Sequence, residues 1–134
     1  MTIRQWDDKV RVTGVSHAGA EATYTTIATI TTAKYGTNAV LGLRAKAVYR
    51  NVGGNTGYGG YAESIGVWDE ANQVIGASVS GNGNAQGHVG SVTVSLIVIK
   101  FVASGSDILV QVSGLDTDSY KWFMIVEITG YETG

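Results

Sequence analysis

The chain contains neither cysteine nor proline among its 134 residues. The absence of cysteine excludes a disulfide framework, a thiolate nucleophile and a cysteine-ligated metal. Because proline is missing, tight turns have to be made by glycine and asparagine, which tolerate the positive φ angles of hairpin turns. The 19 glycines serve this purpose, and the combination favours a β protein.

Charged residues are also scarce: they make up 15% of the chain, and the net charge is −2 at pH 7. A chain with this balance has no overall attraction to nucleic acid or anionic lipid, so neither partner is expected. The most apolar run, "LIVIKFVA", is too short to cross a bilayer and contains Lys100. The charged start "MTIRQWDDKV" is unlike a signal peptide. We therefore expect no membrane insertion.

The length and the 44% of hydrophobic residues are typical of one globular domain covering residues 1–134. No internal repeat, linker or amphipathic helical stretch divides the sequence. We expect residues 1–20 to form an N-terminal arm and a first strand, with "RQWDDKV" as a short turn.

Alternation of apolar and polar residues predicts a series of short strands. In "AVLGLRAKAVYR", residues 39–50, one face would carry Leu41, Leu43, Ala45, Ala47 and Tyr49, and the other Arg44, Lys46 and Arg50. Further strands are expected at about residues 22–33, 61–68, 73–79, 91–101, 108–112 and 121–128. Glycine-rich loops are expected at 51–61 and 80–90. This spacing predicts an all-β fold: an antiparallel, jelly-roll-like β-sandwich of about eight strands, with an immunoglobulin-like strand order as the alternative.

The last predicted hairpin carries a dense set of large apolar residues. In "KWFMIVEI" the inward row is expected to be Trp122, Met124, Val126 and Ile128. Phe123 and Ile125 then point the other way and form an apolar patch if nothing covers them. We interpret these two residues, together with Trp6 in the N-terminal arm, as a candidate subunit interface. Trp6 could equally anchor the arm to its own chain.

Catalytic and metal-binding patterns are weak throughout the sequence. His17 and His88 are isolated, and neither belongs to a zinc-binding spacing. Asp116 and Asp118 could begin a calcium loop, but the remaining ligand positions do not follow, so they are better explained as turn formers. No G-x-S-x-G elbow is present, and the glycine loops lack the Walker and dinucleotide-binding spacings.

Three carboxylates invite comparison with a glycosidase, in which two acids flank a sugar bond. These are Glu63, Asp69 and Glu70, of which the last two fall at a predicted hairpin tip where solvated charge is ordinary. We therefore expect no catalytic residue, no cofactor and no metal site.

One cluster of basic and aromatic residues is a candidate surface for a glycan or a protein partner. Such a surface can stack on sugar rings and bind anionic groups, but it can also be a subunit contact or a solvated face. Its members are Arg44, Lys46, Arg50, Tyr58, Tyr61 and Trp68.

Most of the chain, from about residue 23 to 131, resembles a β-sandwich module of bacteriophage virion proteins. The stretches that carry the resemblance are "TYTTIATITTAKYGTNAVLGLRAKAVYRN", "GGYAESIGVW" and "SGSDILVQVSGLDTDSYKWFMIVEIT". They give a threonine-rich strand and an alternating strand, then a tyrosine-led strand after a glycine loop. The last stretch is a closing hairpin that bears a tryptophan. Modules of this kind occur at the distal ends of tail fibres and tailspikes and in small accessory head proteins.

The resemblance implies a non-enzymatic virion protein, often a homotrimer, that contacts other capsid or tail proteins and in some cases a host-surface glycan. A chain that starts with Met1 and spans one module fits a free-standing decoration or cement protein. A segment taken from a longer fibre would instead favour a receptor-binding tip. The expected location is the virion.

Overall fold

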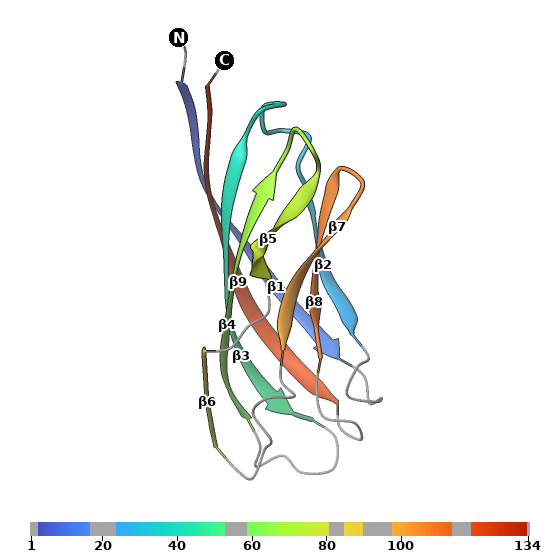
Figure 1. Ribbon diagram of the computed structural model, residues 1–134. Coiled ribbons are helices and arrows are strands. Elements are labelled where there is room, and N and C mark those ends of the chain that lie inside the picture. The colour runs from blue at the N-terminus through green and yellow to red at the C-terminus, as the bar shows by residue number, and fades with distance from the viewer. Residues whose placement is uncertain are drawn as a thin grey trace.

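The computed structural model describes residues 3–16, 24–52, 59–80, 85–89, 98–113 and 119–133. All regular structure in these residues is β-strand, arranged in two antiparallel sheets, which confirms the predicted β-sandwich (Figure 1). The strands are β1 (Ile3–Ser16), β2 (Thr25–Thr31), β3 (Val40–Asn51), β4 (Gly59–Asp69), β5 (Val74–Ser80), β6 (Ala85–Val89), β7 (Ile99–Ser104), β8 (Asp107–Val112) and β9 (Tyr120–Thr133).

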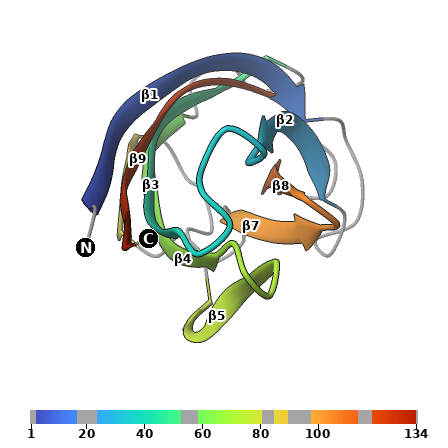
Figure 2. The ribbon, with the colours of Figure 1, turned by 90° about the horizontal axis from the view of Figure 1, so that it is seen from above.

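The large sheet has the strand order β1-β9-β3-β4-β5, with β6 also paired to β4, and the small sheet has the order β2-β8-β7. The first strand thus pairs with the last in one sheet, and the second pairs with the penultimate strand in the other. In this respect the strand order is jelly-roll-like, because strands from the two ends of the chain pair with each other in alternate sheets. The β3–β4 pair differs, because both of its strands are consecutive in the chain and lie in the large sheet. Seen from above, the large sheet curls around the small one, so its outer side is convex (Figure 2). The two chain ends lie together at one end of the molecule (Figure 1).

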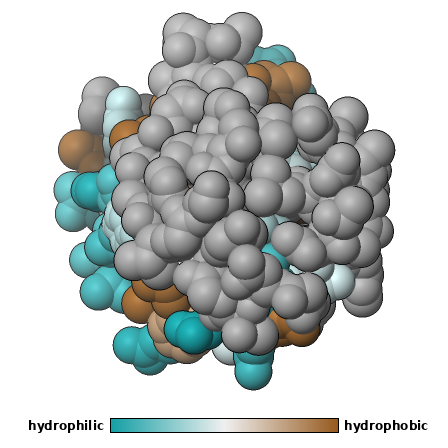
Figure 3. All heavy atoms as spheres, turned by 90° about the horizontal axis from the view of Figure 1, so that it is seen from below, coloured by the Kyte–Doolittle hydropathy of each residue, from teal (hydrophilic) through white to brown (hydrophobic). Residues whose placement is uncertain are grey.

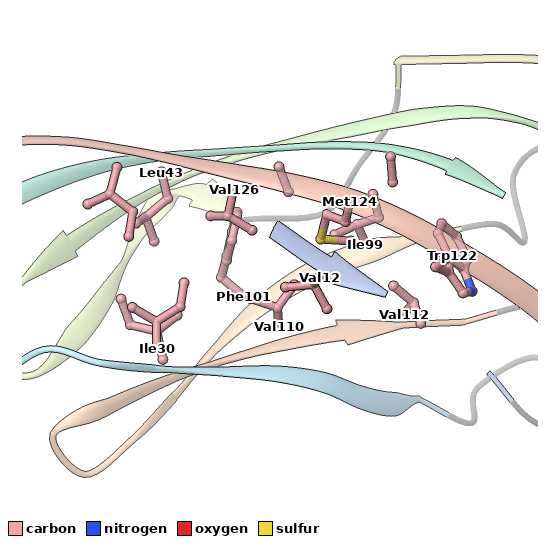
Figure 4. Packing of buried hydrophobic residues seen from close by; sticks show 14 of the residues in the cluster. Val12, Ile30, Leu43, Ile99, Phe101, Val110, Val112, Trp122, Met124 and Val126 are labelled. Atoms are coloured by element: carbon pink, nitrogen blue, oxygen red, sulfur yellow. The ribbon is translucent and has the colours of Figure 1, made fainter. Parts of the chain in front are cut away.

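The core lies between the two sheets and follows the predicted alternation. Along β3 the burial pattern alternates strictly from Val40 to Ala45, with the predicted inward residues buried. In β9, Trp122, Met124 and Val126 are completely buried. Their side chains point toward residues of the small sheet such as Val110 (Figure 4). The predicted inward row of the last strand is confirmed.

Two local predictions were wrong. The segment "RQWDDKV" is not a turn, because β1 pairs with β9 without interruption from Ile3↔Thr133 to Ser16↔Tyr120. Pairing with a distant strand overrides the local charge density that suggested a turn. The expected loop at 80–90 contains a short strand, β6, that pairs with β4. The first part of the expected strand at 91–101 lies outside the described residues.

The predicted β4–β5 hairpin is confirmed, with its turn at "DEAN". The carboxylate of Asp69 accepts hydrogen bonds from the Ala71 amide at 3.0 Å and from the Asn72 side chain at 2.7 Å. The following residue, Gln73, has a φ of 54°, the left-handed conformation that tight turns often require. An aspartate that bonds the backbone two residues on is a common way to start such a turn.

Candidate functional site

The side of the large sheet that faces away from the small sheet is here called the outer face. Its side chains come from alternate residues of β1, β9, β3 and β4, brought side by side by the strand register. Three large apolar residues form one cross-strand row in the order Phe123, Val48 and Tyr61. They are 48%, 53% and 38% exposed, respectively. This apolar row is a group of neighbouring, partly exposed apolar side chains near the start of β9 and the end of β3.

Basic residues surround the apolar row. Six of the chain's nine lysines and arginines lie in this part of the outer face, with two glutamates between them. Six positive and two negative charges give +4, although the whole chain carries −2. The basic half, as we call it, consists of Lys9, Arg11, Arg44, Lys46, Arg50, Lys121, Glu63 and Glu127 together with the apolar row. In the view from the end opposite the chain termini, hydrophobic and hydrophilic residues lie side by side along the left and lower edges (Figure 3).

Two ion pairs tie part of the basic half together. Arg44 Nη2 lies 2.7 Å from Glu63 Oε1, and Lys46 Nζ lies 2.5 Å from Glu127 Oε1. The Arg44 guanidinium and the Tyr61 hydroxyl hold the pKa of Glu63 below its ordinary value, and Lys46 does the same for Glu127. Pairs this exposed add little stability, but they hold long side chains along the sheet. No ion pair to Arg11, Arg50 or Lys121 is found among the described residues.

The other half of the outer face is hollowed. Near the chain ends, β1, β9, β3 and β4 enclose an open hollow of about 780 Å³, here called the terminal hollow. Its floor is low because Gly42 has no side chain, and a Cβ there would meet only the Thr129 carbonyl oxygen, at 3.5 Å. The lining is mainly apolar with one acid: Ile3, Gln5, Trp6, Asp7, Val40, Gly42, Val67, Thr129, Gly130 and Tyr131.

A second hollow of about 550 Å³ lies beside Phe123 in the basic half. Arg50 and Lys121, which are cross-strand partners, stand at its border. Gly59 is the partner of Arg50 on the other side and leaves the space open.

Most of the predicted basic–aromatic surface is where the sequence placed it. Arg44, Lys46, Arg50 and Tyr61 share the outer face, and Tyr58 lies outside the described residues. The prediction that Trp68 belongs to this surface was wrong. Its side chain is completely buried, and the indole Nε1 donates a hydrogen bond of 2.6 Å to Glu70. The signal that could have shown this is parity, because Tyr61 and Trp68 are seven residues apart on one strand and must face opposite sides.

The three candidate interface residues separate into two groups. Phe123 and Ile125 lie on the outer face, as expected. Trp6 instead points inward, and its ring packs edge-on against Tyr35 with centroids 5.2 Å apart. It therefore anchors β1 to the connection between β2 and β3 of its own chain, which is one of the two roles foreseen for it.

A polar cluster on the inner side, near the chain ends, was missed by sequence reasoning. Asp8 accepts a 2.7 Å hydrogen bond from the Tyr35 hydroxyl and lies 3.1 Å from Lys34 Nζ. The buried Glu132 accepts a hydrogen bond of 3.0 Å from the Asn38 amide and is bonded by Arg4. These contacts fasten the connection at residues 32–39 to β1 and β9. They join residues up to 128 positions apart, a separation that no local pattern reveals.

This cluster predicts a loss of stability in acid. The pKa of Asp8 is lowered by the Tyr35 hydroxyl and Lys34, and that of Glu132 by the Asn38 amide and Arg4. Carboxylates with depressed folded-state pKa values stabilise the fold fully above their unfolded values of 3.8 and 4.5, and this contribution disappears as the pH falls through the folded values. We expect the urea midpoint to be level from pH 7 to about pH 5 and to fall steeply below pH 4.

Glu132→Gln should make that fall shallower while lowering the midpoint at pH 7, because the amide keeps the shape but cannot titrate. Denaturation curves at pH 7, 5, 4 and 3 for both proteins test this. A wild-type midpoint that stays constant down to pH 3 would contradict the prediction.

The carboxylates considered above for catalysis have other partners in the structure. No group of three or more potential metal ligands occurs within the ranges that the structure describes. Glu63 is engaged with Arg44, Asp69 with its turn and Glu70 with Trp68. His17, Asp116 and Asp118 lie outside the described residues. Among the described segments none is a helix long and apolar enough to cross a membrane.

Comparisons with known proteins give one structural likeness. No family model and no curated protein matches the chain. Among solved structures, the tailspike protein of Acinetobacter baumannii phage AM24 is similar, with a TM-score of 0.44 and 16% sequence identity. The alignment covers 92% of this chain and 26% of the tailspike, so the chain spans about a quarter of that protein's length. A likeness at this level assigns no role by itself.

Proposed function

We propose that the chain is a non-enzymatic structural protein of a bacteriophage virion that works through contacts with copies of itself and with other coat proteins. The observation that carries the contact role is the apolar row of Phe123, Val48 and Tyr61, exposed on the outer face of the large sheet and surrounded by charge. Apolar patches with polar rims mark protein interaction sites. The assignment to a virion rests on the sequence resemblance described above.

Within the virion, a symmetric oligomer on the capsid or the tail suits this chain. Modules of the kind it resembles are often homotrimers, and the resemblance allows either a decoration or cement role on the head or a place at a fibre tip. In both roles the outer face is the side of the large sheet that neighbours can contact, because its opposite side is filled by the core.

A carbohydrate-binding, receptor-recognition role is the alternative, and one feature favours it. Tyr61 is partly exposed beside the Arg44–Glu63 pair, so a ring face and hydrogen-bonding groups lie together. The burial of Trp68 removes the largest aromatic ring from this surface. Glycan-array binding that is lost in Tyr61→Ala, with the fold intact, would favour this alternative. Absence of binding on a broad array would remove it.

The virion assignment is tested by asking whether the chain is part of a particle. We expect mass spectrometry of gradient-purified particles, from lysates of cells that carry the gene, to find the chain in a fixed ratio to the major coat protein. Antibodies against the purified chain should label those particles at a single location in electron micrographs. A chain abundant in the soluble lysate but missing from every particle fraction would overturn the assignment.

A further inference from the structure

Acidic residues gather at the end of the molecule that carries the chain termini. The connection at residues 32–39 lies there (Figure 1). The Thr32 amide donates a hydrogen bond of 3.3 Å to the Ser106 carbonyl in the β7–β8 turn, and the Glu70 amide in the β4–β5 turn donates one of 3.0 Å to the Ala39 carbonyl. Two positive and six negative charges give −4 in this region. The acidic end, as we call it, consists of Arg4, Lys34, Asp7, Asp8, Asp69, Glu70, Asp107 and Glu132.

Ion pairs within the chain leave an equal surplus on the acidic end and on the basic half. Among the described residues there are four ion pairs, two within each of these surfaces. Each pair uses one of six cations in the basic half or one of six acids at the acidic end, so four of each are left without an ion pair in the described part of the chain. These cations are Lys9, Arg11, Arg50 and Lys121, and the acids are Asp7, Asp69, Glu70 and Asp107.

The surplus of positive charge does not serve the fold of the single chain. Arg50 and Lys121 are direct cross-strand partners on β3 and β9, and like charges placed directly opposite each other destabilise a sheet. Next to them, Phe123 and Val48 are about half exposed. A surface of cations around exposed apolar side chains fits a partner that supplies acids together with apolar side chains.

The acidic end of another copy is such a partner surface. The strand register of β9, β3, β4 and β5 places an acid within an apolar cross-strand row, in the order Tyr131, Val40, Asp69 and Val74. The three apolar members of this row are 53%, 40% and 46% exposed. The acidic end therefore complements the basic half both in charge, −4 against +4, and in its exposed apolar side chains.

We propose that copies of the chain associate head to tail, with the basic half of one copy against the acidic end of the next, and that three copies close into a ring. This inference rests on the proposed contact role and names the surfaces that meet. A head-to-tail contact uses two different surfaces, so repeated contacts form a ring when their rotation closes.

A reciprocal two-fold contact between outer faces is less favourable than this arrangement. Lys9 and Arg44 lie in one cross-strand row between the apolar row and the terminal hollow. A two-fold axis at that row would set each of them against the same residue of the other copy, which is a repulsive contact. In the head-to-tail arrangement both residues belong to a surface that meets only the acidic end.

Light scattering after size exclusion, over a range of loading concentrations, tests the assembly. At low salt we expect the mass to approach three times 14.0 kDa, and to fall toward that of one chain as added salt screens the charges. Lys121→Glu and Arg50→Glu should each weaken the association about tenfold or more. The matched control is Lys100→Glu, which makes the same charge change on β7 of the small sheet and should leave the association unchanged.

A charge exchange tests which surfaces meet. Asp7→Lys combined with Asp107→Lys should prevent assembly, as should Arg50→Glu combined with Lys121→Glu, and a chain with all four changes should assemble again. Asp7 pairs with Thr129 of β9, eight residues from Lys121 or roughly 27 Å along the strand, so restoration requires contact between copies. Far-UV spectra and urea midpoints that match those of the original chain would show that the variants are folded.

A monomer at every concentration, a two-fold dimer, or assemblies that grow past three copies would overturn the ring. A trimer that both Lys121→Glu and Asp107→Lys leave intact would overturn the proposed surfaces. None of these results would remove the chain from a virion, because particle incorporation is measured separately. Conversely, a charge-dependent ring that is absent from every particle would support the contact and contradict the proposed function.

Discussion

Replacing Trp122 with alanine should remove about 3–5 kcal/mol from the free energy of unfolding. The side chain is completely buried between the sheets and lies against the Tyr49 ring, with centroids 5.1 Å apart. Truncation deletes the transfer free energy of a large aromatic and leaves a cavity that β9, held on both sides by β1 and β3, cannot close. Since domains of this size are stable by about 5–15 kcal/mol, the loss takes a large share of the total.

Urea denaturation followed by circular dichroism measures this effect. With a slope of about 2 kcal/mol per molar, the midpoint should fall by roughly 1.5–2.5 M. The next residue gives a matched control, because Phe123 has a similar aromatic side chain on the same strand but is about half exposed. Phe123→Ala should cost less than about 1 kcal/mol at concentrations where the chain is monomeric. Equal losses in the two variants would contradict the inward and outward assignment for β9.

The alternation of apolar and polar residues was enough to predict the β-sandwich, because this pattern can be read from neighbouring residues along the chain. A period of two fixes which residues share a face, and this was sufficient for β3, for the β4–β5 hairpin and for β9. It failed where structure depends on a partner strand. The charged segment of β1 forms a strand only because β9 runs beside it along its whole length. The short β6 similarly exists as an addition to β4.

The candidate site was predicted in part for the same reason. The basic residues of β3 were assigned to one face correctly, since they belong to a single strand. The registers of β1 and β9 bring three further basic residues beside those of β3 on the outer face, namely Lys9, Arg11 and Lys121. Strand registers cannot be read from the sequence. The whole-chain charge of −2 consequently concealed a local surplus of +4. Trp68 was misplaced because proximity in sequence to Tyr61 was given more weight than strand parity.

Gly130→Val should be the second strongly destabilising change, this time by overpacking. Gly130 of β9 is the cross-strand partner of both Trp6 and Leu41. A Cβ at this position would lie 2.8 Å from the Val40 carbonyl oxygen and closer still to the Leu41 side chain. Backbone cannot give way as a flexible side chain does, so β9 and β3 would have to separate. We expect a loss of about 3 kcal/mol, at the upper end for overpacked cores.

Gly42 provides the control, on the neighbouring strand and at the same end of the sheet. A Cβ there meets only the Thr129 carbonyl oxygen at 3.5 Å, an ordinary van der Waals contact. Gly42→Ala should therefore be neutral or stabilise the fold by about 0.5–1 kcal/mol, because glycine within a strand has an entropic cost. Thermal and urea denaturation of the two variants should thus move in different directions. If Gly130→Val were tolerated as well as Gly42→Ala, the close approach of β9 to β3 near the chain ends would be incorrect, and with it the floor of the terminal hollow.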